Sequence, residues 1–363
     1  MSEPTPLHGQ IARHGAVCRE EAGWIVPSHF GNAAEEYAAA RRHAAIFDLS
    51  YRGQIQITGT DAASFLHNFC THDIQRLPAG QGREAFFTTV KAKVIAHAWI
   101  DHRELPDGSA QFWLDTTAQQ GEILLQHLNH YLISEDVTLS DKTRQFVQLH
   151  LAGPDTHEIL ETALGETLPR LRELHHETKV FSGDTVTWRR HDWLNLLGYD
   201  LFCASVSAAS VWQALVAAGA RPAGQDAFEW LRVEAGFPLY GVDIDADRFV
   251  VELDRAAQAI SYTKGCYLGQ EPIVMARDRG HVNRWLRGLK VSGAIPPARA
   301  APVLRQGETV GEVTSAVVSP RLGVIALAYL RRGHDQPGTP VEVVTDQGSQ
   351  PAEVTSLPFT AQE

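Results

Sequence analysis

The sequence K-G-C-Y-L-G-Q-E, residues 264–271, is the most informative stretch of the chain. It places a lysine, a thiol and two glycines within eight positions, which is typical of a site and unusual for a core. The glycines permit backbone conformations with positive φ, so a tight loop can present the thiol of Cys266. Pro272 suits the first turn of a helix that continues through residues 273–277. Cys266 is therefore expected near a helix N-terminus and close to the cation of Lys264, and both features favour the thiolate.

The composition around this motif is that of a soluble globular protein. The chain has 363 residues, of which 44% are hydrophobic and 21% are charged, and its net charge is −11. This length predicts two or three domains. No apolar run approaches the roughly 18 residues of a membrane span, and the N-terminus lacks the features of a secretory signal, so we expect a cytoplasmic protein without a membrane partner. The acidic balance predicts no direct binding to nucleic acid.

Residues 264–290 are locally basic. They contain six basic and two acidic residues, a local balance of +4: Lys264, Arg277, Arg279, Arg284, Arg287 and Lys290 against Glu271 and Asp278. Two interpretations stay open, a solvated helix face with a strand edge, or an anion site beside the motif.

The four cysteines lie far apart in the sequence. Cys18, Cys70, Cys203 and Cys266 form no C-x-x-C pair. A sequence-local zinc or iron–sulfur cage and a disulfide framework are therefore not expected, and we predict no metal site. Cys70 and Cys203 have apolar neighbours and are expected to be buried, which leaves Cys266 as the chemically distinctive thiol.

Strand-like and helical patterns alternate through the first two thirds of the chain. Residues 1–28 show no periodicity and are expected to be a loosely structured lead-in. Farther on, Asp226 as N-cap with Glu229 three residues later resembles a capping box, and this helix is expected to end at Gly236. Glu234 then falls in the last turn, where the helix dipole disfavours a carboxylate. Beyond residue 285, short β-rich runs with regular turns predict a small antiparallel barrel or sandwich.

These segments together resemble a known family. Residues 264–271 match the K-G-C-[FY]-x-G-Q-E signature of the YgfZ family, folate-binding proteins related to the aminomethyltransferase (T-protein) of the glycine cleavage system. Further segments agree in the same order along the chain, at residues 46–50, 58–62, 231–236, 311–315 and 357–359. The resemblance implies an α+β fold with two α+β subdomains and a C-terminal antiparallel β-barrel around a central folate cavity. The implied domains are a folate-binding region of two interleaved subdomains at 29–284 and the barrel at 285–363.

The resemblance also implies a ligand and site residues. The cofactor would be tetrahydrofolate or a one-carbon-substituted reduced folate, and the family's pterin-binding carboxylate falls on Glu234. A carboxylate presents two acceptors in one plane, which match the 2-amino and ring N–H donors of a reduced pterin. The alternative for Glu234 is an exposed surface carboxylate. The candidate folate-binding residues are Glu234, Arg232, Tyr267, Gln270, Glu271 and Arg277, and the candidate catalytic residues are Cys266 and Lys264.

One segment departs from the aminomethyltransferase pattern. In those enzymes, the strand after a Thr-containing run ends in a paired Asp-Asp, and one Asp assists chemistry at the folate nitrogens. Here the corresponding positions are Ala96 and His97. His97 could act as a general base near neutral pH, although a single histidine on a strand is more often structural.

Three functions stay open at this point. Because the Asp pair is missing, we expect a tetrahydrofolate-binding accessory factor for iron–sulfur cluster assembly or repair, acting on cluster enzymes that include tRNA-modifying ones. Iron–sulfur proteins or assembly factors would be partners, since one thiolate cannot hold a cluster alone. The alternative is a folate-dependent one-carbon (aminomethyl or methyl) transferase or demethylase with Cys266 as nucleophile or proton donor. The third is a folate-binding module without chemistry, so whether the chain is an enzyme stays undecided.

Overall fold

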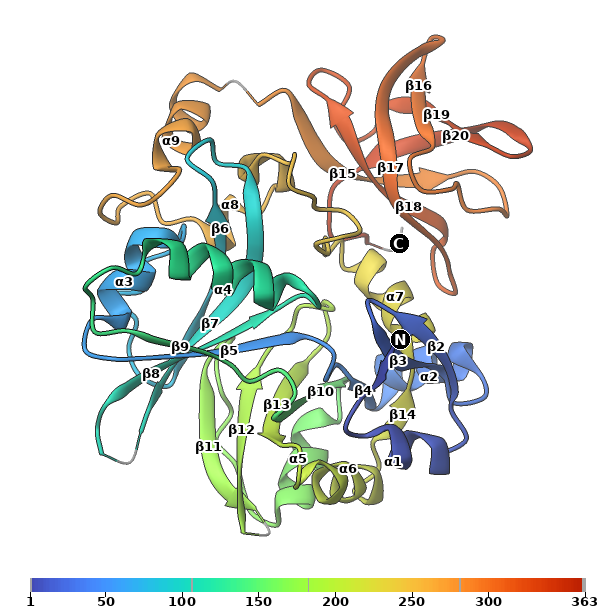
Figure 1. Ribbon diagram of the computed structural model, residues 1–363. Helices are drawn as coiled ribbons and strands as arrows, with labels where there is room; N and C mark the ends of the chain where they lie inside the picture. The colour runs from blue at the N-terminus through green and yellow to red at the C-terminus, as the bar shows by residue number, and fades with distance from the viewer. Residues whose placement is uncertain (1, 106, 182, 281, 361–363) are drawn as a thin grey trace. The chain divides into compact units, whose positions relative to one another are not determined.

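The computed structural model describes residues 2–105, 107–181, 183–280 and 282–360. The chain forms two compact units (Figure 1). Unit 1 comprises Met1–Phe87 and Ala96–Phe228, and unit 2 comprises Thr88–Ile95 and Glu229–Glu363. Unit 2 therefore contains the short segment 88–95, which interrupts unit 1 in the sequence, in addition to the C-terminal third of the chain. Among the described residues, no helix is both long and apolar enough to cross a membrane.

Two large sheets dominate unit 1. The five-stranded sheet has the order β6 (Gln81–Thr88), β7 (Val94–Glu104), β8 (Ala110–Thr116), β5 (Gly53–Thr58) and β9 (Thr138–Asp141). The six-stranded sheet has the order β11 (His176–Phe181), β12 (Asp184–Arg190), β13 (Gly198–Ala204), β10 (Phe146–Ala152), β4 (Ala45–Asp48) and β14 (Arg221–Ala223). Both sheets are mainly antiparallel, and in the six-stranded sheet β14 pairs with β4 in parallel.

Helices cover an apolar face of each sheet. The core of the five-stranded sheet includes residues of α3 (Ala62–Phe69) and α4 (Gln120–Tyr131). The core of the six-stranded sheet includes residues of α5 (Thr156–Leu164) and α6 (Ala208–Ala217), which pack beside each other (Figure 1). The helix α2 (Ala33–Arg42) packs on β4 and β14. Each sheet thus has its own hydrophobic core.

Residues 2–28 form regular elements, in contrast to the loose lead-in expected from the sequence. They form β1 (Glu3–Pro4), α1 (His8–Arg13), β2 (Val17–Glu21) and most of β3 (Trp24–His29), with the three strands paired in one sheet. Leu7 and Ile11 are fully buried in the core of the six-stranded sheet. These two residues are one helical turn apart, a spacing too short to give a visible periodicity in the sequence.

A buried network of charges links the two large sheets of unit 1. The guanidinium of Arg189 donates to Asp101 at 3.1 Å, to Asp115 at 2.7 Å and to Asp200 at 2.6 Å, and all four side chains are fully buried. Arg52 donates to the second oxygen of Asp115 at 2.6 Å. Removing one member would leave an uncompensated buried charge, which typically costs about 3–5 kcal/mol.

His176 lies beside this network and must stay neutral. The pKa of His176 is lowered to about 4, chiefly by burial; Asp101 opposes this shift, and the cations of Arg103 and Arg189 act in the same direction as burial. The side chain is 5% exposed. An unfolded histidine titrates near 6.5, so between about pH 4 and pH 6.5 the unfolded chain binds more protons than the folded one.

We therefore predict that the free energy of unfolding rises with pH across this window. The stability that the neutral His176 contributes is lost as the pH falls from 6.5 to about 4. The substitution His176→Asn should reduce this rise by about 3 kcal/mol, measured by urea denaturation at a series of pH values. His14→Asn, at an exposed position just after α1, is the control and should leave the slope unchanged. An unaltered slope in His176→Asn would contradict the assignment.

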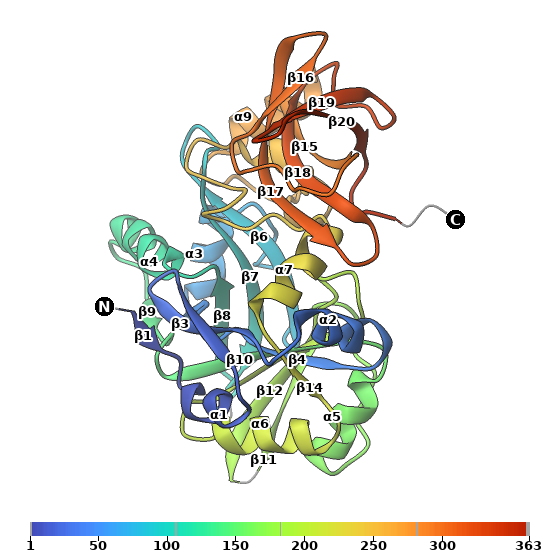
Figure 2. The ribbon, with the colours of Figure 1, turned by 90° about the vertical axis from the view of Figure 1, so that its right-hand side faces the viewer.

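Unit 2 contains a closed antiparallel barrel, as Figure 2 shows. Its strands follow the order β15 (Arg284–Val291), β18 (Gly323–Arg331), β17 (Glu308–Ser319), β16 (Pro302–Arg305), β19 (Pro340–Thr345) and β20 (Gly348–Thr355). Before the barrel come η1 (Val250–Leu253), α8 (Ala256–Ala259) and α9 (Gln270–Arg279). The expected α+β class with a C-terminal antiparallel β-barrel is confirmed.

The helix α7 (Gln225–Glu234) carries the chain from unit 1 into unit 2. It begins at Gln225, so Asp226 lies in its first turn and is not the expected N-cap. Glu229 does not close a capping box, because both of its oxygens accept from Arg232 one turn later. The helix ends at Glu234 as the sequence indicates, and Gly236 follows with φ +67°.

Candidate functional site

The loop that carries Cys266 is fixed to residues 88–89 of the same unit. Gly269, the residue before α9, has φ +84°, and a Cβ there would lie 2.3 Å from Thr88 Oγ1 and 2.5 Å from Thr89 O. Thr88 Oγ1 donates to Leu268 O at 3.0 Å. The second glycine of the motif is therefore required both by its backbone conformation and by this close approach.

Residues 88–95 form a tight turn that is held on its other side by residues 248–250. Thr89 N donates to Lys93 O at 2.9 Å, and Thr89 Oγ1 accepts from Lys93 N at 3.2 Å. Val94 N donates to Arg248 O at 3.0 Å, and Val250 N donates to Ala92 O at 3.2 Å. This turn is thus the support on which the Cys266 loop rests.

The three residues at the centre of the motif differ in exposure. Cys266 is exposed, whereas Lys264 and Tyr267 are each 7% exposed. The Lys264 ammonium lies 4.7 Å from the centre of the Tyr267 ring, a cation–π distance. The lysine predicted to stand beside the thiol is therefore directed onto an aromatic face, while the thiol faces solvent.

Glu234 is a buried carboxylate with donors provided for it. It is 3% exposed, so the alternative of an exposed surface carboxylate is wrong. The hydroxyl of Ser319 donates to one oxygen, and Arg321 Nη2 lies 3.3 Å from the other. Its main-chain oxygen accepts from Phe359 N at 2.9 Å. A cation and a hydroxyl thus offset the unfavourable helix dipole at the end of α7.

Arg232 is committed to contacts within the protein. Its five N–H groups donate to the carboxylate of Glu229 twice, to Phe237 O, to Asp243 and to Ser315. Burial lowers its pKa, but the carboxylates of Glu229 and Asp243 outweigh burial, and the pKa is raised overall. No N–H of Arg232 is left over for a ligand, in contrast to its expected place among the folate-binding residues.

Asp243 connects this helix end to the barrel. One of its oxygens accepts from Thr314 and Ser315 at 2.6 Å each, and the other accepts from Arg232 at 2.8 Å and Leu239 N at 3.0 Å. Sequence reasoning missed Asp243, and it also missed the partners of Glu234 in the barrel. The segment 311–315, which contains both hydroxyl donors, was the signal that could have found Asp243.

The remaining predicted residues lie on or near α9. Gln270 and Glu271 occupy its first turn, half-buried and exposed respectively. Arg277 is exposed, donates to Asp278 at 2.6 Å, and lies 4.7 Å from the centre of the Tyr262 ring. The cation of Arg277 is thus already engaged, but it stays accessible at the surface.

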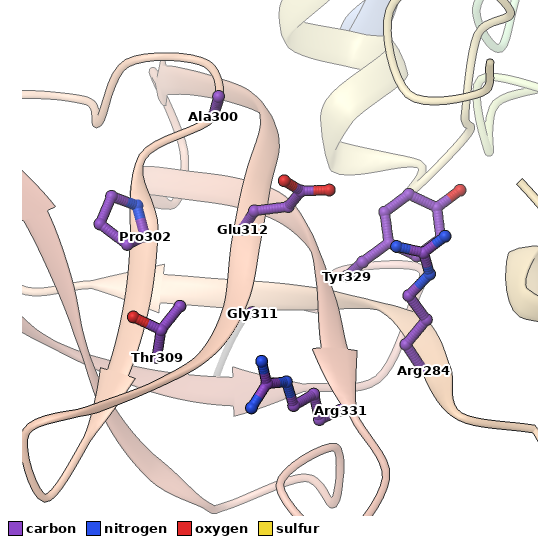
Figure 3. Close-up of a pocket in the computed structure, with 8 residues that line it drawn as sticks. All are labelled: Arg284, Ala300, Pro302, Thr309, Gly311, Glu312, Tyr329 and Arg331. Atoms are coloured by element: carbon purple, nitrogen blue, oxygen red, sulfur yellow. The ribbon is translucent and has the colours of Figure 1, made fainter. Parts of the chain in front are cut away.

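The basic run does not form one continuous anion site. Arg284 donates to Glu252 at 3.0 Å and lines a cavity of about 300 Å³ on the barrel, shown in Figure 3. In the β15–β18 register it stands opposite Arg331, and the same cavity is lined by Glu312, which accepts from Arg248 at 2.6 Å. The run is therefore split: Arg277 and Arg279 lie on α9, Arg284 lines the barrel cavity, and Arg287 donates to Asp254.

His97, at the position where the aminomethyltransferase pattern has an Asp, is buried in unit 1. It is 2% exposed, its Nε2 lies 2.8 Å from Glu84 Oε1, and its ring stacks on Phe86 with centroids 4.5 Å apart. Ala96 is fully buried. Within the described ranges, no group of three or more His, Cys, Asp or Glu side chains could hold a metal ion.

Comparisons with known proteins agree with this architecture. A family model described as the GCVT N-terminal domain matches residues 7–259, and one described as the glycine cleavage T-protein C-terminal barrel domain matches residues 284–360. The chain belongs to the glycine cleavage T-protein family. This T-protein family relationship confirms the T-protein-like fold expected from the sequence, at a level broader than the YgfZ signature.

Individual T-protein relatives match along almost their whole length. A protein named Aminomethyltransferase from Rubrobacter xylanophilus is 31% identical over 98% of this chain and 93% of its own. A protein of the same name from Streptomyces avermitilis is 29% identical over 99% of both chains. The crystal structure of glycine cleavage system aminomethyltransferase T from Bartonella henselae has a TM-score of 0.90 at 23% identity, covering 100% of this chain and 99% of its own, and so shares the fold.

These comparisons correct the expected function. The accessory role in iron–sulfur cluster assembly, with its cluster-protein partners and its link to tRNA modification, is wrong as the leading interpretation. The relatives that match nearly the full chain are named Aminomethyltransferase, which was the alternative. The expectation gave one eight-residue motif and one missing Asp pair more weight than the relationship of the whole chain.

The packing of Gly269 predicts how the Cys266 loop responds to substitution. Gly269→Ala should destabilise unit 2 by about 2 kcal/mol more than Gly280→Ala, because only the first Cβ meets backbone and side-chain atoms below 3.0 Å. Gly280 also has a positive φ, +63°, but nothing lies within 4 Å, so it controls for backbone strain alone. Chemical denaturation of both variants measures the difference, and equal losses would refute the close approach.

Proposed function

We propose that this chain transfers the carbon of an aminomethyl group to a reduced folate, with tetrahydrofolate as the acceptor substrate. The observation that carries the proposal is the match to proteins named Aminomethyltransferase over 98–99% of the chain. The K-G-C-Y-L-G-Q-E motif and the Ala96–His97 replacement would mark it as a YgfZ-like branch of the T-protein family.

The reaction needs proton transfer but no oxidant or reductant. Two C–N bonds form from the carbon to N5 and N10 of the folate, while the bond to the donor group and the bond to the amino nitrogen break. The folate nitrogens lose two protons. One is taken up by the released donor group and the other by the amino nitrogen, which leaves as ammonia. The protein must therefore bind the pterin and supply a group that moves protons.

Glu234 suits the first of these tasks. Ser319 and Arg321 fix the plane of its carboxylate, and burial strengthens any hydrogen bond that it accepts. A planar carboxylate of this kind matches the two parallel N–H donors of a reduced pterin. We assign Arg232 a positioning role instead of a direct contact, because it holds the helix end that presents Glu234.

The motif loop would supply the remaining contacts. Tyr267, Gln270 and Glu271 lie at and just before the start of α9, where a folate could meet polar groups. The exposed cation of Arg277 would attract the carboxylates of the glutamate moiety of folate.

Proton transfer would fall to the motif as well. His97 is buried against Glu84, and Ala96 has no titratable group, so the Asp pair has no substitute at its own position. Cys266 is exposed and follows the buried cation of Lys264 by two residues. We assign Cys266 as the proton donor and Lys264 as the residue that sets its surroundings.

Loss of the Glu234 carboxylate should weaken folate binding. Glu234→Gln keeps the shape but replaces one acceptor with a donor, so the affinity for tetrahydrofolate should fall about tenfold to a hundredfold. Calorimetry measures this, with Glu308→Gln, at an exposed position on β17 of the same unit, as the matched control. Equal affinities for wild type and Glu234→Gln would remove Glu234 from the site.

Catalysis should depend on Cys266. Wild-type protein should consume methylenetetrahydrofolate in the presence of ammonium and a thiol acceptor, the reverse of the proposed transfer. Cys266→Ser should lower the rate about 10² to 10³-fold without weakening folate binding. Cys18→Ser, at a half-buried thiol of unit 1, is the control. Folate binding without any turnover by wild type would overturn the transferase proposal and leave a binding protein.

A further inference from the structure

A second cavity, unrelated to the proposed folate site, lies within unit 1. It has a volume of about 630 Å³ and is lined by residues of both large sheets. Volumes of roughly 300–1,000 Å³ are typical of small-molecule sites. Arg103 and Gln111 come from the five-stranded sheet, and Phe146 and Phe202 come from the six-stranded sheet.

The strand registers place the polar lining groups on one sheet face. Arg103 on β7 stands opposite Gln111 on β8, and Trp113, two residues along β8, stands opposite Gln56 on β5. Side chains two residues apart on a strand share a face, and directly opposed residues do too. One guanidinium, two amides and an indole are thus gathered on the wall of the cavity.

Arg103 is a buried cation with few acceptors. Its side chain is 10% exposed, and its guanidinium lies 4.6 Å from the centre of the Trp113 ring and 5.1 Å from that of Phe202. Its one side-chain hydrogen bond among the described residues runs from Nη2 to Asp101 at 3.3 Å, and Nε is buried without a partner there. Burial lowers the pKa of Arg103 to about 10, although Asp101 opposes it.

Two other buried arginines make more hydrogen bonds. Arg189 donates to three carboxylates, although its Nε also lacks a partner among the described residues, and Arg232 uses all five N–H groups. Burying an unsatisfied donor costs about 1–3 kcal/mol, and more for a charged group. The guanidinium of Arg103 packs near two aromatic rings and has spare N–H groups beside the cavity. It can therefore donate hydrogen bonds to a ligand in the cavity.

The amides of the same wall also lack protein partners. Gln111 is 7% exposed, yet neither it nor Gln56 makes a side-chain hydrogen bond within the described part of the chain. The opposite wall supplies aromatic surface, since Phe146 is half-buried and its ring packs edge-on against Trp113 at 4.6 Å. The cavity therefore combines spare hydrogen-bond donors with a flat apolar surface.

We propose that this cavity binds a small aromatic carboxylate, whose carboxylate accepts from Arg103 and the amides of Gln56 and Gln111. A single negative charge is favoured over two. The Arg52, Arg103 and Arg189 cations are already matched by Asp101, Asp115 and Asp200, and Glu104 also lines the cavity. The site is independent of the proposed transferase reaction.

The probe is 2-naphthoate, with 2-naphthylmethanol as its neutral counterpart. Calorimetry with the full-length protein should show binding of the carboxylate at least tenfold tighter than that of the alcohol. Trp113 lines the cavity, so naphthoate should also change its fluorescence, and Trp113→Phe should reduce that change. Tetrahydrofolate should not displace the probe.

Two variants test the assigned contacts. Arg103→Gln should weaken naphthoate binding at least tenfold and leave binding of the alcohol unchanged, while Asp101 keeps Arg189 as a partner. Gln111→Leu removes one amide without touching the charge network and should weaken naphthoate binding about threefold to tenfold. Arg144→Gln, an exposed arginine paired with Glu3, makes the same exchange outside the cavity and should change nothing.

Carboxylate-selective binding that is lost in Arg103→Gln and weakened in Gln111→Leu supports the site, whether or not the protein turns over folate. No naphthoate binding by wild type, equal binding of acid and alcohol, or equal losses in Arg144→Gln would overturn it. If Arg103→Gln fails to fold, Gln111→Leu and the acid–alcohol comparison still decide the question.

Discussion

The interaction between Arg232 and Asp243 is the constraint on which the proposed folate site depends. Asp243 accepts from α7, from the chain after it and from two hydroxyls of β17, while Arg232 has no N–H left over. Breaking such a buried pair leaves one charge uncompensated at a cost of about 3–5 kcal/mol. The position of Glu234, two residues along the helix, is therefore fixed to the barrel through its neighbour as well as through Ser319.

Unit 1 uses the same kind of interaction for a different purpose. Arg189 joins carboxylates from three strands, and Arg52 shares one of them, so the two sheets are linked by matched charge. Arg103 belongs to this balance of charges but makes one hydrogen bond within it among the described residues, from Nη2 to one oxygen of Asp101 at 3.3 Å, while Arg189 donates to the other oxygen. A charge can thus be neutralised within the protein and still offer donors to a ligand.

The sequence predicts the parts of this molecule that are set locally. Alternation and turn residues indicate the barrel, and the Gly236 stop places Glu234 at a helix end. The partners of Glu234 lie 85 and 87 residues farther along the chain, so no local pattern could reveal them. The role of Arg232 was misjudged for the same reason, since an arginine next to a ligand residue looks the same in sequence whether its donors are spent or not. The iron–sulfur expectation failed because one motif was weighed above the whole chain.

Replacing the Asp pair by Ala96 and His97 changes which proton movements the chain can support. A carboxylate has lost its proton at neutral pH and can only accept one, whereas a thiol still holds its proton and can give it up. The imidazole of His97 is enclosed between Phe86 and Glu84, so it does not restore the accepting group at a reachable position. The exposed titratable groups of the motif are the Cys266 thiol and the Glu271 carboxylate, and the motif loop rests on the turn at Thr88 and Thr89, within the segment 88–95 that ends just before Ala96. If the aminomethyl carbon is transferred here as proposed, a thiol suits departure of the amino nitrogen, which needs a proton delivered, better than activation of the folate nitrogen, which needs one removed.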